Sequence, residues 1–133
     1  MIGYTIVGTK DLTRAKAFYA PLFKHMGMPL CFEDAQVASW GKRDDETMPR
    51  FFVCYPFDDQ PATVGNGTMT AFRLKTASDV DTLHDLAMQG GGTDEGKPGF
   101  RPEAYGDEFY VAYVRDPDGN KLAFACYDGK ANP

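Results

Sequence analysis

The sequence has few of the features that mark secreted, membrane-spanning or nucleic-acid-binding proteins. Its three cysteines, Cys31, Cys54 and Cys126, are an odd number spread over strand-like segments, so we expect buried, reduced thiols rather than a disulfide framework. No apolar run approaches the roughly 18 residues of a membrane span, and the N-terminus lacks the basic and apolar regions of a signal peptide. We therefore expect a cytoplasmic protein with no membrane partner.

Basic residues and histidines are also scarce. The chain has 14 Lys and Arg against 19 Asp and Glu, a net charge of -5, and the basic residues are scattered. Such a surface repels phosphate backbones, so we expect no nucleic-acid partner. Its two histidines, His25 and His84, fall on predicted helices and are interpreted as packing or solvated residues rather than metal ligands.

The remaining composition is that of an ordinary globular domain, with 43% apolar and 25% charged residues among 133. In the first half, a β-branched strand over 2–9 is followed by a helix that Asp11 caps and that Gly27 and Pro29 end. Three strands are predicted after that helix, over 30–33, 36–41 and 50–55. This pattern is a βαβββ unit and indicates an α+β fold.

The second half repeats this pattern at an offset of 65 residues, which superposes Thr5 on Thr70 and Gly27 on Gly92. Ser78 is the predicted N-cap of its helix. Strands are predicted over 68–74, near Thr93, over 109–115 and over 121–127, with a Gly- and Pro-rich loop over 96–107. We predict one module over about 1–57, a linker over about 58–66 and a second module over about 67–130.

Two motifs carry a family resemblance. The segment GTKDLTRAKAFY after the first strand and the segment FYVAYVRDPDGNKL before the last strand resemble those of the vicinal oxygen chelate superfamily, which includes glyoxalase I, bleomycin resistance proteins and extradiol dioxygenases. The resemblance implies two βαβββ modules that form a half-open mixed β-barrel around one ligand site. It also implies that the chain forms a homodimer.

Catalytic members of that superfamily hold a divalent metal through a His in the first strand of each module and carboxylates in the last strands. At the matching positions this sequence has Tyr4, Met69 and Ala123. Phenol, thioether and methyl groups do not make a divalent-metal site. We therefore hypothesise that the protein binds no catalytic metal, and we predict no cofactor.

Strand alternation predicts which side chains line the ligand site. If Tyr4 and Met69 face it, so does Arg73, which either anchors an anionic group or reaches solvent or an acidic loop residue. In the last strand, Lys121 and Tyr127 lie on the same side as Ala123. The predicted ligand-binding residues are Tyr4, Trp40, Met69, Arg73, Arg101, Tyr105 and Phe109.

Two polar segments are interpreted as structural. The glycines at 90–92 end a helix rather than begin one, so they do not form a phosphate-binding loop. The segment RDPDGNK is interpreted as a hairpin turn in which Asp116 and Asp118 are exposed.

Three functions stay open. The leading hypothesis is a binding protein that holds a small organic molecule without a metal. The second is an enzyme, either a glyoxalase-like lyase or isomerase or a dioxygenase with displaced ligands, or a metal-independent catalyst that uses Tyr4, Tyr105 or Arg73. The third is an interaction domain.

Overall fold

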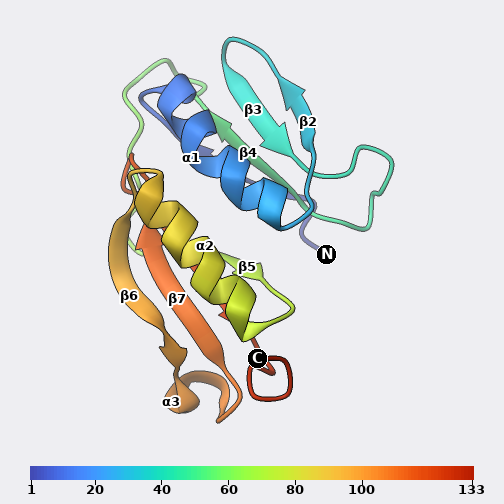
Figure 1. The fold of residues 1–133 in the computed structure, drawn as a ribbon. Coiled ribbons are helices and arrows are strands. Elements are labelled where there is room, and N and C mark those ends of the chain that lie inside the picture. Colours follow the sequence, from blue (N-terminus) through green and yellow to red (C-terminus); the bar gives the residue numbers. More distant parts are fainter. The chain divides into compact units, whose positions relative to one another are not determined.

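The computed structural model describes residues 1–133, which divide into two compact units, Met1–Asn66 and Gly67–Pro133 (Figure 1). The first contains β1 (Tyr4–Gly8), α1 (Leu12–His25), β2 (Leu30–Glu33), β3 (Val37–Trp40) and β4 (Arg50–Cys54). The second contains β5 (Thr70–Arg73), α2 (Ala77–Gln89), β6 (Thr93–Phe100), the short α3 (Pro102–Tyr105), β7 (Tyr110–Arg115) and β8 (Lys121–Cys126).

Both units have the same topology. The strand order is β1-β4-β3-β2 in the first sheet and β5-β8-β7-β6 in the second. The β1–β4 and β5–β8 pairs are parallel and the remaining pairs are antiparallel. Neither sheet closes on itself, so the structure confirms the predicted α+β fold of two βαβββ units.

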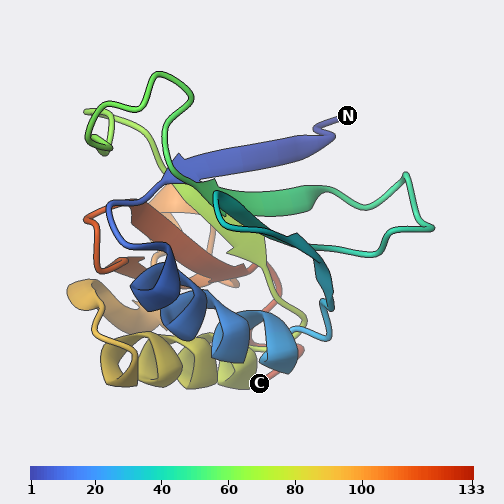
Figure 2. The same ribbon diagram turned by 90° about the horizontal axis from the view of Figure 1, so that it is seen from above.

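Helix α1 covers one face of the first sheet (Figure 2), and an aromatic core lies between them. Asp11 caps the helix by accepting a hydrogen bond from the Arg14 N–H, as predicted. The Phe23 ring stacks on Trp40, with centroids 4.9 Å apart, and the Tyr19 ring lies 4.9 Å from that of Phe51. Burial of each such side chain contributes about 1.5–3 kcal/mol, so this face supplies much of the first unit's stability.

Helix α2 packs the second sheet in the same way, against Leu122 and Phe124, which are fully buried. The predicted N-cap, Ser78, is wrong by two residues. Thr76 caps this helix, because its hydroxyl oxygen accepts from the Asp79 N–H at 3.0 Å. The Ser78 N–H lies in the first turn and donates instead to the carbonyl of Pro133.

The segment 96–107, predicted as a loop, is partly regular. Strand β6 continues to Phe100 and pairs with β7 despite register shifts between Asp94 and Gly96 and between Gly96 and Gly99. Gly and Pro in a strand are signs of such bulges, and the sequence pattern does not distinguish them from a loop.

The three cysteines are free thiols, as predicted, but only Cys126 is buried, whereas Cys31 and Cys54 are partly exposed. The longest helix, α1, has 14 residues, and none of the helices has the length and apolarity that a span of the bilayer requires.

Candidate functional site

Each sheet has one face against its helix and one face away from it, which we call the open face. In the second sheet the helix-facing side is marked by Tyr110, whose hydroxyl donates to Asp81 of α2 at 2.7 Å. Side chains alternate along a strand, so Val111, Tyr113 and Arg115 of β7 lie on the open face. The register adds the other open-face residues, which are Ala71, Arg73, Lys121, Ala123 and Ala125.

An aromatic cluster with an arginine forms at one end of this open face. The cluster consists of Tyr105, Phe109 and Tyr127, whose three ring centroids lie 4.9 to 5.5 Å apart. The guanidinium carbon of Arg73 lies 5.4 Å from the centroid of Tyr127. Cation–π attraction between a guanidinium and a tyrosine ring favours this position of the charge beside Tyr127.

No ion pair joins the Arg73 guanidinium to a carboxylate, and the residue is exposed. Arg73 therefore reaches solvent rather than an acidic loop residue, and its role as an anchor for an anionic group stays a prediction. What remains is a cation, beside three aromatic rings, with free N–H donors. Such a fork of donors matches the geometry of a carboxylate or phosphate group.

The open face of the first sheet is mainly apolar. Tyr4 and Ile6 are 62% and 54% exposed, and the Tyr4 ring lies edge-on to Phe52 with centroids 5.4 Å apart. Arg50 shares this face, but its Nη2 donates to the carbonyls of Lys42 and Arg43. Its charge is thus used to hold the 42–49 loop.

Cys54 also lies on the open face of the first sheet, paired with Gly8 of β1. Burial raises the pKa of its thiol. A thiol with a raised pKa is protonated at neutral pH and is neither a good nucleophile nor a good metal ligand.

One of the predicted contact residues does not lie on an open face. Trp40 is 3% exposed and stacks on Phe23 under α1, because it occupies the helix-facing position of β3. The Arg101 guanidinium donates to the carbonyls of Lys97 and Phe100, and thus holds the backbone of β6. The prediction for Trp40 is therefore wrong. Arg101 stays a predicted contact, because a Cβ on Gly99, which pairs with Val111 of the open face, would lie 2.8 Å from the Arg101 Nη1.

The structure brings Arg73, Tyr105 and Phe109 together, whereas Tyr4 lies on the first unit's own open face. Met69 immediately precedes β5 and is 48% exposed. Tyr127 was not among the predicted contacts, although it joins Arg73 to the aromatic cluster. The alternation of strand 121–127 was the signal that could have identified it.

The residues at the family's metal positions do not fit a metal. Tyr4, Met69 and Ala123 offer no imidazole or carboxylate, and Ala123 is buried. No group of three or more His, Cys, Asp or Glu side chains lies close enough together to hold a metal ion. His84 is instead bonded to Asp94 at 2.9 Å, and this bond is the main cause of the lowered pKa of Asp94.

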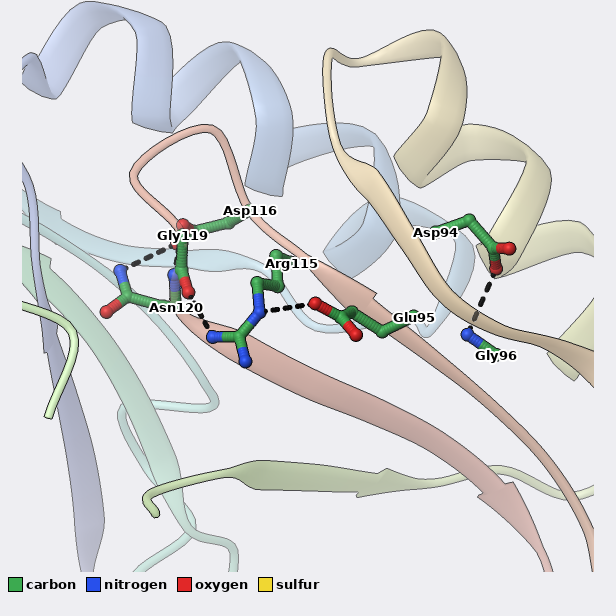
Figure 3. Close-up of polar contacts among 7 residues, drawn as sticks. All are labelled: Asp94, Glu95, Gly96, Arg115, Asp116, Gly119 and Asn120. Carbon is green, nitrogen blue, oxygen red and sulfur yellow. Dashed lines mark hydrogen bonds and ion pairs between the residues drawn. The ribbon is translucent and has the colours of Figure 1, made fainter. Parts of the chain in front are cut away.

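The RDPDGNK turn is structural, as interpreted, but Asp116 is buried rather than exposed. Its Oδ1 accepts from the N–H groups of Asp118 and Asn120, both at 2.9 Å. The neighbouring Arg115 donates to Glu95 at 2.6 Å and to the Gly119 carbonyl at 2.8 Å (Figure 3). These hydrogen bonds hold the hairpin that joins β7 to β8, and they engage the carboxylates of Asp116 and Glu95.

The first unit also has a surface hollow of about 440 Å³ beside the connecting segment. None of the predicted contact residues lines it. The hydroxyl of Tyr55, in its wall, accepts from the Leu12 N–H at the start of α1. Its lining consists of Thr9, Lys10, Gln36, Tyr55, Pro56, Asp59, Gln60, Pro61 and Ala62.

Comparison with known proteins identifies solved structures that share this fold. No family model and no curated protein matches the chain. Among solved structures, a glyoxalase/bleomycin resistance protein from Albidiferax ferrireducens T118 is 33% identical, with a TM-score of 0.85, over 95% of this chain and 98% of that chain.

Two more distant structures share the fold. A glyoxalase/bleomycin resistance protein/dioxygenase family enzyme from Burkholderia phytofirmans PsJN is 19% identical over 94% of this chain and 97% of that chain, with a TM-score of 0.72. A lactoylglutathione lyase from Agrobacterium tumefaciens is 18% identical over 95% of this chain and 92% of that chain, with a TM-score of 0.64. With its two βαβββ units, the chain belongs to the glyoxalase/bleomycin resistance protein family of the vicinal oxygen chelate superfamily.

Proposed function

We propose that this protein binds a small organic anion with an aromatic or apolar body, and that it does so without a metal. The proposal is carried by Arg73, whose guanidinium lies over Tyr127 on the open face of the second sheet with no carboxylate partner. Members of this family bind ligands on the open faces of their sheets, as the resemblance implies.

The chemistry of the aromatic cluster supports this ligand class. Tyr105 is 72% and Tyr127 43% exposed, so two of the three rings offer surface for a planar or apolar group. The Arg73 donors supply an adjacent contact for a carboxylate. Met69, which is exposed and precedes β5 of the same unit, is proposed as a further contact with the apolar part of the ligand. Tyr4, on the open face of the first unit, stays a prediction.

A pair of matched probes tests the charge requirement. Naphthoate and the uncharged naphthylmethanol share a ring system and differ in the carboxylate. We expect naphthoate to bind about tenfold more tightly, as for a hydrogen bond to a charged group, in calorimetric titrations. Arg73→Met should abolish that preference and leave the weaker binding of naphthylmethanol unchanged.

The control is Lys24→Met, which removes one positive charge from the exposed end of α1. It should leave both affinities unchanged. Equal affinities of the two probes for the unmodified protein, or an Arg73→Met variant that retains the preference, would contradict the proposal.

The absence of a metal requires a separate experiment. Elemental mass spectrometry of the untagged protein, incubated with Zn, Ni, Mn or Fe and then desalted, should find no stoichiometric metal. One metal per chain together with a raised melting temperature would overturn this part of the proposal and favour a glyoxalase-like or dioxygenase reaction. The expected homodimer stays a prediction that light scattering tests.

A further inference from the structure

A second cation lies on the same open face as Arg73. Lys121 begins β8, and its Nζ lies 5.7 Å from the centroid of the Tyr113 ring. Lys121, Ala123 and Ala125 alternate along β8, and Ala125 pairs with Arg73. The open face therefore has a cation over a tyrosine ring near each end.

The contrast with Arg115 shows why Lys121 is available. Arg115 lies directly opposite Lys121 in the β7–β8 register. It forms an ion pair with the Glu95 carboxylate, with Nε and Oε1 2.6 Å apart (Figure 3). No ion pair joins Lys121 to any carboxylate. In a chain with a net charge of -5, two unneutralised cations on one sheet face are an unusual local feature.

Between the two cations lies a buried apolar cluster, so only the tyrosine rings there are available to a ligand. Val111, Ala123 and Ala125 are 1–2% exposed, and Tyr113 packs against them. Lys121 precedes Ala125 by four residues, which corresponds to about 13 Å along a strand. A ligand that contacts both cations must therefore carry two anionic groups on a long apolar body.

We propose that the ligand is an elongated dianion that lies along the open face of the second sheet. One anionic end is bound by Arg73 and the other by Lys121, with the apolar body on the tyrosine rings. This inference rests on the proposed function, since it adds a second charge contact to the Arg73 site.

The test compares two rigid probes, biphenyl with one para carboxylate and biphenyl with a carboxylate at each para end. We expect the dicarboxylate to bind roughly fivefold more tightly than the monocarboxylate, as for a partly exposed ion pair. Terephthalate, which is too short to reach both cations, should bind no more tightly than benzoate.

Two variants separate the inference from the proposed function. Lys121→Met should reduce the affinity for the dicarboxylate to that for the monocarboxylate, whose own affinity is unchanged. Arg73→Met should weaken the binding of both probes about tenfold. Lys24→Met is the matched charge control and should change neither affinity.

The two failures give different results. If the dicarboxylate and monocarboxylate bind equally, or if Lys121→Met leaves the dicarboxylate advantage intact, the dianion inference is wrong and the Arg73 site still holds. If Arg73→Met binds both probes as tightly as the unmodified protein, the proposed function itself is wrong.

Discussion

The two units share one topology but use the cations of their open faces differently. In the first unit, Arg50 donates to two carbonyls of the 42–49 loop. In the second, Arg115 likewise bonds Glu95 and the Gly119 carbonyl, but Arg73 and Lys121 lie over tyrosine rings and have no carboxylate partner. The same βαβββ scaffold thus supports a structural arginine in each unit and, in the second, candidate ligand contacts as well.

One pair of equivalent positions illustrates the difference between the open faces of the two units. The 65-residue offset matches Gly8 in β1 to Arg73 in β5. A Cβ on Gly8 would lie 3.0 Å from the Cβ of Ala62 in the connecting segment. The first unit therefore leaves little room for a side chain at the position where the second unit carries its proposed anion contact.

The largest expected change in the free energy of unfolding tests whether side chains on the helix-facing side stabilise the fold more than those on the open face. Trp40→Ala should lower the free energy of unfolding by about 3–5 kcal/mol, because it empties part of the core under α1. Tyr4→Ala, on the exposed open face, should cost far less. Chemical denaturation of the two variants measures both, and equal losses would contradict the assignment of Trp40 to the core.

The next prediction concerns the Gly8–Arg73 pair. Gly8→Ala should destabilise the protein by about 1–2 kcal/mol, because the new methyl group crowds Ala62. Arg73→Ala should leave the free energy of unfolding almost unchanged, since Arg73 is exposed and makes no ion pair. A tolerated Gly8→Ala together with a destabilising Arg73→Ala would reverse the comparison.

Replacing Ser39 by alanine is expected to stabilise the protein, by a smaller amount than the losses predicted above. Its hydroxyl is buried on the open face of the first sheet and has no hydrogen-bond partner. Leaving a buried hydroxyl unpaired costs about 1 kcal/mol or more, so Ser39→Ala should raise the melting temperature slightly. Ser78→Ala, on the exposed surface of α2, is the control, and a destabilised Ser39→Ala would show that the hydroxyl has a partner.

The smallest expected effect is a difference between the unmodified protein and Tyr110→Phe in how stability changes at alkaline pH. Burial and the bond to Asp81 raise the pKa of Tyr110 from 10.0 to about 12. The folded state therefore keeps a proton that the unfolded state loses, so this stabilisation is present below pH 10 and lost as pH rises through 12. Unfolding measured across that window should show a shallower loss for Tyr110→Phe, and parallel curves would rule out the shift.

The sequence predicted the fold well because the fold depends on periodicity. Helix α1, with its Asp11 cap, and the hairpin between β7 and β8 both follow from local patterns. The alternation of apolar residues in 68–74 also placed Arg73 on the face away from α2. The bulged strand β6 was predicted as a loop, because its glycines and proline are equally typical of loops.

The candidate site was less predictable because composition does not say which face a ring occupies. Trp40 and Phe109 were both predicted contacts, yet Trp40 belongs to the helix core and Phe109 to the aromatic cluster. Whether Arg73 has a carboxylate partner depends on tertiary structure, which no local pattern encodes.

The most direct test of the central claim is to map where an aromatic carboxylate binds. In amide chemical-shift mapping with naphthoate, we predict that the largest shifts occur at Arg73, Tyr105 and Tyr127 of the second unit and disappear in Arg73→Met. Shifts that are confined to the first unit, or that are unchanged in the variant, would contradict the account.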